Sequence, residues 1–236
     1  MQSVVIIGGT QGSGRALAAR YASRGANVVI TGRSAERAAD VAGELSKDAP
    51  GTVSGLSLDL TRPAEVAERL ATIEQVDRLA VVGMVRDRNT LAAYDTAKAT
   101  ELALTKVVGY TAVAAALASR MARDASVLLF GGMAKDLPYP GSTTVTVVNS
   151  AVTGLVRTMS VELAPVRVNA IHPGVIADSP AWEGNTAAAP LLEGFRKGTL
   201  TGRLGSMDNI VDACVFLLEN ADANGIDLRM DGGRRP

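Results

Sequence analysis

The chain has no excess of charge of either sign, because 24 lysine and arginine residues balance 24 aspartate and glutamate residues among its 236 residues. Without a basic excess to neutralise phosphates, we expect no nucleic-acid partner. The chain also has a single cysteine, Cys214, in an apolar stretch. One cysteine permits neither a disulfide nor a cysteine metal site within the chain, and its surroundings predict a core residue in a reducing compartment. We expect no bound metal.

Targeting and membrane signals are also lacking. The N-terminus has no basic segment followed by a cleavage site, and no apolar stretch approaches the length that we expect of a membrane span. We therefore expect a cytoplasmic protein without a membrane partner. The hydrophobic share of 47% predicts a sizeable core, and no shift in composition marks a linker, so residues 1–236 are interpreted as one domain.

Short β-branched runs alternate with helical stretches along the chain. The predicted strands lie near residues 3–7, 27–31, 53–57, 78–82, 126–130, 166–170 and 226–229. This alternation is typical of an α/β fold with a seven-stranded parallel sheet covered by helices on both faces. Two stretches, 91–121 and 145–163, predict long apolar helices that pack against a second subunit or under their own chain. Near 178–198 the alternation breaks, which indicates a flap over a ligand site or an ordinary surface excursion.

A glycine-rich segment follows the first predicted strand directly, and a helical stretch from Arg15 follows it. A glycine segment between a strand and a helix is the context that a dinucleotide-binding turn requires. Gly8 permits the tight turn, Gly12 lets the backbone approach a pyrophosphate, and Gly14 allows close packing of helix and strand. The free N–H groups at the helix N-terminus favour phosphates. We interpret the chain as a single-domain, doubly wound Rossmann fold. The predicted dinucleotide contacts in this segment are Gly8, Thr10, Gln11, Gly12, Ser13 and Gly14.

The ends of the second and third predicted strands indicate which dinucleotide binds. Arg33 stands where NAD-preferring folds place an acid for the ribose 2′-hydroxyl. An arginine suits a 2′-phosphate, so the predicted cofactor is NADP. Ser34 either adds a hydroxyl contact or caps the next helix. Asp59, which precedes Leu60, either meets the adenine amino group or caps a turn.

Together with downstream segments, these residues resemble the short-chain dehydrogenase/reductase family over nearly the whole chain. The downstream segments are 154–155, 161–165, 168–174, 202–205 and 230–233. Because the family binds a nicotinamide dinucleotide at the carboxyl ends of its strands and usually forms dimers or tetramers, the resemblance implies the same here, as a dimer or homotetramer. Further cofactor contacts are expected at Gly83, Asn149, Pro173, Gly174, Val175 and Ile176.

The catalytic residues of this family have no counterparts at the matching positions. Members typically use a tyrosine acid, a lysine, a serine and an asparagine. The register of the resembling segments places Val145, Asn149, Gly132 and Lys106, respectively, at these positions. A valine has no proton to donate, and a neutral amide supplies no positive charge to lower a neighbour's pKa. We therefore predict an atypical mechanism, with Lys106, Tyr139, Thr144 or a water as the substitute proton donor.

Other polar residues flank the same predicted strand ends. Lys135 and Asp136 follow the fifth strand, and Arg86 and Asp87 follow the fourth. The only histidine, His172, occupies a position where the resembling family ordinarily has one. It is interpreted as structural or as a lining residue of the cleft rather than as a catalytic base.

Two functions fit these observations. The first is an NADPH-dependent reductase, in a specialised biosynthetic pathway, that reduces a carbonyl or imine carbon of a small polar substrate. Orientation supplies much of the rate of hydride transfer, and a general acid contributes only about 10²–10⁴-fold, so loss of the acid does not abolish reduction. The alternative is a catalytically silent NADP-binding redox sensor or scaffold subunit. A non-redox lyase would not need an arginine for the 2′-phosphate.

Overall fold

The computed structural model describes residues 1–85, 87–183, 185 and 188–235. The strands of this part of the chain form one sheet in the order β3-β2-β1-β4-β5-β6-β7, and all neighbouring pairs are parallel. The strands are β1 Ser3–Ile7, β2 Asn27–Gly32, β3 Thr52–Ser57, β4 Val76–Val81, β5 Met121–Phe130, β6 Arg167–Pro173 and β7 Asp227–Met230. The predicted single-domain α/β fold with seven parallel strands is confirmed.

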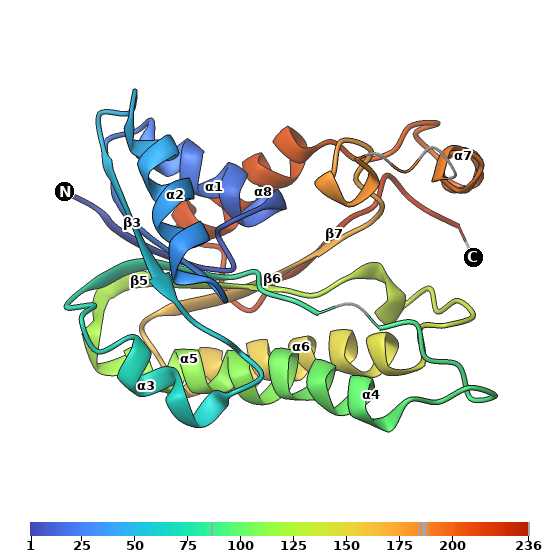
Figure 1. The fold of residues 1–236 in the computed structure, drawn as a ribbon, viewed down its shortest axis with the longest axis horizontal. Coiled ribbons are helices and arrows are strands. Elements are labelled where there is room, and N and C mark those ends of the chain that lie inside the picture. The colour runs from blue at the N-terminus through green and yellow to red at the C-terminus, as the bar shows by residue number, and fades with distance from the viewer. Residues whose placement is uncertain (86, 184, 186–187, 236) are drawn as a thin grey trace.

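Helices cover both faces of this sheet (Figure 1). One face carries α1 Gly12–Ala22, α2 Ala35–Ser46 and α8 Met207–Glu219, and the other carries α3 Val66–Arg69, α4 Thr96–Ala103, α5 Tyr110–Leu117 and α6 Thr143–Glu162. A further helix, α7 Ala189–Lys197, lies outside these layers near the C-terminus. Cys214 on α8 is fully buried, as predicted, and burial raises the pKa of its thiol.

The central strand β1 shows why the sequence folds in this way. Val5 pairs with Val29 on β2 and with Leu79 on β4, so β1 is bordered on both edges. Val4 and Ile6 pack with the helices of one face, whereas Val5 and Ile7 pack with those of the other. A strand buried on both faces needs a continuous apolar run. The chain order reverses between β1 and β4, and a crevice at the carboxyl ends of such strands is where α/β folds bind ligands.

The predicted helix over 91–121 is shorter and less regular than expected. Asp95 caps α4, because its side chain accepts the Lys98 N–H at 3.1 Å. A π-helical turn over Leu104–Gly109 separates α4 from α5, and β5 already begins at Met121 rather than near 126. The early start of β5 reflects pairing of Met121 with Val76 across an irregularity in β4.

One helical segment contradicts the prediction that no apolar stretch approaches the length of a membrane span. The helical segment Thr96–Arg120 has 25 residues and a mean hydropathy of 1.5, so it is long and apolar enough to cross a membrane. In this fold its apolar side chains are part of the core. Tyr110, Val113 and Leu117 are fully buried against the sheet and its other helices. Burial under its own chain therefore accounts for the apolar face of α5.

Candidate functional site

The glycine turn lies between the end of β1 and the start of α1. Gly8 and Gly12 adopt φ values of +88° and +54°, which side chains disfavour. A Cβ on Gly8 would lie 2.6 Å from the backbone nitrogen of Gly83, and one on Gly14 would collide with the Gly8 carbonyl oxygen. A Cβ on Gly12 would meet nothing within 4 Å. Gly8 and Gly14 therefore serve close packing, whereas the space beside Gly12 is open to a ligand.

A groove of about 700 Å³ runs beside this turn. Thr10, Gln11 and Gly12 line it from the turn, and Arg15 and Arg37 line it from α1 and α2. The lining is completed by Ala16, Asp40, Val41, Glu44, Asp178, Pro180, Glu183 and Met207. Neither arginine of the groove was among the predicted site residues. The signal for Arg37 was its position in the first turn of α2, directly after the strand end at which Arg33 stands.

The residues predicted to choose the cofactor are at the ends of β2 and β3. Ser34 caps α2, because its hydroxyl accepts the Arg37 N–H at 3.2 Å. Asp59 holds a turn by accepting the Thr61 N–H at 3.0 Å and the Thr61 hydroxyl at 2.8 Å. Arg33 is exposed, and its guanidinium forms no ion pair or hydrogen bond within the described part of the chain. It is therefore available to an anionic ligand.

Lys106 lies in the π-helical turn and is 2% exposed. Its ammonium donates to the carbonyl oxygens of Phe130 at 2.8 Å and Gly131 at 3.0 Å, and to Asn149 Oδ1 at 2.9 Å. Burial lowers the pKa of Lys106 to about 7, while the three oxygens favour the charged form. Because they take all three N–H groups, the predicted role of direct proton donor needs correction: Lys106 has no N–H left for a substrate.

Asn149 and Gly132 lie against each other at the carboxyl end of β5. Asn149 is on α6 and is 4% exposed. A Cβ built on Gly132 would lie 2.8 Å from Asn149 Nδ2. A side chain at position 132 would therefore displace this amide. Val145, one turn before Asn149 on the same helix, is half-buried.

The other two predicted proton donors differ in accessibility. Thr144 is 8% exposed, and its hydroxyl is sealed from solvent without a hydrogen-bond partner in the described residues. It cannot reach a substrate in this structure. Tyr139 is 46% exposed, in a loop where its backbone N–H donates to Ser142 Oγ at 2.9 Å. Among the residues described, no hydrogen bond links Lys106, Tyr139 and Thr144 to one another.

The remaining polar residues near the strand ends mostly pair locally. Lys135 forms an ion pair with Asp136 at 3.2 Å. Asp87 is buried and accepts the Asn89 backbone N–H at 2.7 Å. Arg86 lies outside the described residues.

His172 is fully buried at the end of β6, with both ring nitrogens occupied. Its Nδ1 accepts the Gly132 N–H at 3.2 Å, and its Nε2 lies 2.8 Å from Asp227 Oδ1. This arrangement requires the proton on Nε2 and a neutral ring. Burial lowers the pKa of His172 below its ordinary value of 6.5, against the opposing effect of Asp227. The geometry agrees with the structural interpretation of this histidine.

The lowered pKa predicts a destabilisation in mild acid. Between the unfolded pKa and the lower folded pKa, the unfolded chain binds more protons, so stability falls as the pH drops below about 6.5. The matched variant His172→Gln lacks this titration, and its free energy of unfolding should change less between pH 6.5 and 5. Urea unfolding measures the difference, and the one histidine gives a single imidazole signal for ¹H NMR titration. A measured pKa above 6.5 would contradict the prediction.

The segment after β6 reaches the groove at Asp178 and Pro180. The Val175 carbonyl accepts the Gly205 N–H at 3.0 Å, and the Ile176 carbonyl accepts the Trp182 indole N–H at 2.9 Å. Trp182 belongs to the predicted flap at 178–198, of which residues 184, 186 and 187 lie outside the described part of the chain. Trp182 therefore ties the start of the predicted flap to the segment expected to flank the cofactor.

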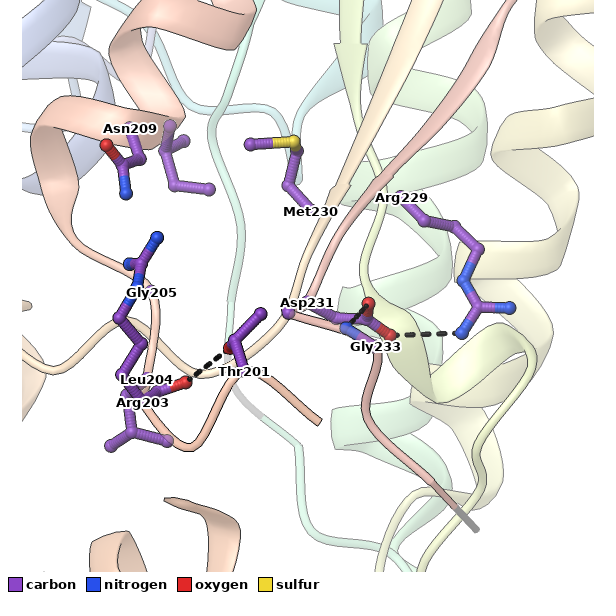
Figure 2. A pocket seen from close by; sticks show the side chains of 11 residues that line it. Thr201, Arg203, Leu204, Gly205, Asn209, Arg229, Met230, Asp231 and Gly233 are labelled. Atoms are coloured by element: carbon purple, nitrogen blue, oxygen red, sulfur yellow. Dashed lines mark hydrogen bonds and ion pairs between the residues drawn. The ribbon is translucent and has the colours of Figure 1, made fainter. Parts of the chain in front are cut away.

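A second, smaller cavity of about 330 Å³ lies beside the end of β7 (Figure 2). Asp231 holds this region together by accepting from Arg229 and from the Gly233 N–H, both at 3.0 Å. The cavity is further lined by Thr201, Arg203, Leu204, Gly205, Asn209, Ile210, Met230 and Gly232. None of the predicted site residues lies among its lining residues.

Comparison with known proteins assigns the family. A family model described as enoyl-(acyl carrier protein) reductase matches residues 8–234. The short-chain dehydrogenase/reductase ucsE of Acremonium sp. is 31% identical over 98% of this chain and 94% of its own length. This chain belongs to the short-chain dehydrogenase/reductase family. Members of this family use a nicotinamide cofactor, NAD or NADP.

Two further matches extend the comparison of this short-chain dehydrogenase/reductase. The cis-2,3-dihydrobiphenyl-2,3-diol dehydrogenase of Paraburkholderia xenovorans (strain LB400) is 31% identical over 98% of this chain and 90% of that protein. The structure of MalC Reductase/Diels-Alderase from Malbranchea aurantiaca has a TM-score of 0.90 at 22% identity, covering 98% of this chain and 95% of that chain. The second likeness concerns the fold alone.

Proposed function

We propose that this protein is an NADPH-dependent reductase that acts on a carbonyl or imine carbon of a small polar substrate by an atypical mechanism. The observation that carries the proposal is the glycine turn. Its packing glycines hold β1, β4 and α1 together, while the space beside Gly12 stays open at the N-terminus of α1. The free N–H groups of a helix N-terminus favour a pyrophosphate there.

Two arginines that follow β2 in the chain, Arg33 and Arg37, support NADP over NAD. Arg33 follows β2, where an acid would serve the ribose 2′-hydroxyl, and it is free for an anion. Arg37 reaches the groove, and its guanidinium lies 3.5 Å from Gln11 Oε1. Two cations near the end of β2 suit a 2′-phosphate, which carries more negative charge than a hydroxyl.

The residues fit a nicotinamide dinucleotide, which supplies a hydride when bound. The task of the chain is then to orient the substrate and to provide a proton. Val145 has no exchangeable proton, and the Lys106 ammonium is occupied by protein oxygens. Tyr139 and water remain as sources, since the Tyr139 side chain is accessible. The reduction of a carbonyl fits the relatives, whose names are those of dehydrogenases and reductases.

A silent NADP-binding sensor or scaffold is the second candidate. It is favoured by the sealed hydroxyl of Thr144 and by the fully bonded ammonium of Lys106. Both groups are built into the protein rather than directed at a substrate. A sensor needs the dinucleotide groove but no proton donor.

One experiment separates these candidates. NADPH binding is measured by fluorescence, and cofactor oxidation is then followed against a panel of aldehydes, ketones and imines. Binding with turnover supports the reductase, and binding without turnover on any panel member favours the sensor. Absence of NADPH binding would contradict both.

Replacing Arg33 by alanine tests the cofactor assignment. If Arg33 contacts the 2′-phosphate, Arg33→Ala should weaken NADPH about 10- to 100-fold and leave NADH within about twofold, because a hydrogen bond to a charged group contributes about 1.5–3 kcal/mol. Arg24→Ala, a change at an exposed arginine beyond the end of α1, should alter neither affinity. Fluorescence titration measures both constants. Equal losses for NADPH and NADH would overturn the assignment.

We also propose that the protein is a cytoplasmic homo-oligomer, a dimer or a tetramer. Val147 and Val161 on α6 are 65% and 77% exposed, which is unusual for apolar side chains and suits burial against a second subunit. Light scattering of the purified protein tests this, and a monomeric mass would contradict it.

A further inference from the structure

One end of the Asn149 amide is held by the protein. Lys106 donates to Asn149 Oδ1 at 2.9 Å, which orients the amide because only its oxygen end can accept a hydrogen bond. The same ammonium is anchored to the carbonyl oxygens of Phe130 and Gly131. Lys106 therefore holds the oxygen end of the amide and places a positive charge beside it.

The other end of the amide is free. Asn149 Nδ2 lies against Gly132, where a Cβ would be 2.8 Å away, and it donates to no acceptor in the described residues. Unlike the Thr144 hydroxyl, this nitrogen is not sealed from solvent. A nearly buried donor without a protein acceptor is costly unless something else satisfies it. The nitrogen is therefore available to an acceptor oxygen from outside the chain, such as that of a water or a ligand.

Contacts connect this amide to the dinucleotide crevice. The Phe130 carbonyl oxygen, which accepts from Lys106, also lies 3.3 Å from the Tyr110 hydroxyl. That hydroxyl donates to the Gly83 carbonyl at 3.0 Å, and Gly83 borders Gly8 of the glycine turn. The free amide end therefore lies at the carboxyl edge of the sheet, beside the strands between which the crevice opens.

We propose that Asn149 Nδ2 is the hydrogen-bond donor that polarises the carbonyl oxygen of the substrate, and that Lys106 is a positioning residue that orients the amide. The inference rests on the proposed reductase function, and it replaces the predicted cofactor contact of Asn149. When bound NADPH supplies the hydride to the carbonyl carbon, the π electron pair would move to the oxygen, where the amide N–H would stabilise the charge. Asn149 loses no proton, and the proton that completes the alcohol comes from Tyr139 or water.

The variant Asn149→Asp tests the donor. A carboxylate keeps the shape and the contact with Lys106 but removes both N–H groups. The kcat with the best aldehyde or ketone of the panel should fall at least about 100-fold, as for loss of an oxyanion donor, without a decrease in the melting temperature. Asn149→Ala, which adds no charge, should lose as much kcat and leave the Kd of NADPH within about twofold. An unchanged kcat, or a rise in Kd that accounts for the loss, would overturn the proposal.

Recovery of activity by a second substitution distinguishes a hydrogen-bond donor from a residue with a structural role only. Gly132→Ser on the Asn149→Ala background places a hydroxyl in the space that the amide leaves, and should recover at least about tenfold in kcat. In the wild-type background the same serine crowds Nδ2 and should lower kcat. Failure of the serine to recover any activity in the alanine variant would count against a donor at this point.

A spectroscopic test does not depend on turnover. Acetate, a carboxylate probe, is titrated into ¹⁵N-labelled protein with and without NADP⁺ at pH 7.5. The Asn149 side-chain amide signal, assigned by its loss in Asn149→Asp, should shift with acetate, and the shift should be lost in Lys106→Met while the backbone spectrum is retained. An unmoved signal would overturn the inference. If wild-type protein binds NADP⁺ and its Asn149 signal shifts with acetate, but the protein reduces no substrate of the panel, the reductase proposal is refuted while the free amide donor is retained.

Discussion

Replacing Gly14 by alanine is expected to weaken NADPH binding at least about 100-fold and to lower the free energy of unfolding by about 2–3 kcal/mol. A Cβ on Gly14 collides with the carbonyl oxygen of Gly8, and Gly8 in turn lies against the backbone of Gly83. Neither backbone can yield without opening the turn, and overpacking of this kind costs about 1–3 kcal/mol, occasionally more. An opened turn would also lose the charge-assisted hydrogen bonds to the pyrophosphate of the proposed dinucleotide, each contributing about 1.5–3 kcal/mol.

The matched control is Gly43→Ala. Gly43 lies inside α2, and a Cβ there would meet nothing within 4 Å. Alanine at this helical position should raise the free energy of unfolding by about 0.5–1 kcal/mol and leave NADPH affinity unchanged. Urea unfolding and fluorescence titration measure both effects. Wild-type affinity in Gly14→Ala would contradict the assigned role of the turn.

Replacing Gly131 by alanine is expected to lower the free energy of unfolding by about 3 kcal/mol. A Cβ on Gly131 collides with the ring of His172, which is fully buried and held by Gly132 and Asp227. The ring cannot turn away without breaking these hydrogen bonds, and a buried group left unsatisfied costs about 1–3 kcal/mol in addition to the strain.

Two further variants isolate the collision. Gly132→Ala should destabilise the fold less than Gly131→Ala, because the atom it meets is the end of the Asn149 side chain rather than a held ring. In the double variant Gly131→Ala/His172→Ala the effects should be less than additive, since the second change removes the obstacle. Additive losses, measured by urea unfolding, would show that the ring is not the cause.

Local patterns were sufficient to predict most of the strands. The predicted strand at 3–7 coincides with β1, and the predicted helix at 145–163 nearly coincides with α6, because apolar and β-branched runs reflect burial directly. The start of β5 was not predictable in this way. Its first residues include exposed Arg123 and Asp124, and only the pairing with β4 across an irregular register extends the strand to Met121.

The same distinction between local and long-range properties applies to the candidate site. The sequence alone pointed to the glycine turn and Arg33, because both depend on local context after a strand. It also placed Lys106 and Asn149 at candidate positions. The contact between the two side chains could not be predicted from the sequence, because 43 residues separate them along the chain. Their contact depends on the packing of the π-helical turn and α6 at the end of β5.

The sequence by itself determined that this protein is an α/β domain with a glycine turn between its first strand and helix, because the period of apolar residues and the conformations open only to glycine are local properties. The tertiary structure decided which polar groups are free. It occupies the Lys106 ammonium and seals the Thr144 hydroxyl, while the Asn149 amide nitrogen and Arg33 stay available. Hydrogen-bond satisfaction depends on partners that are distant in sequence, so only the packed chain decides it.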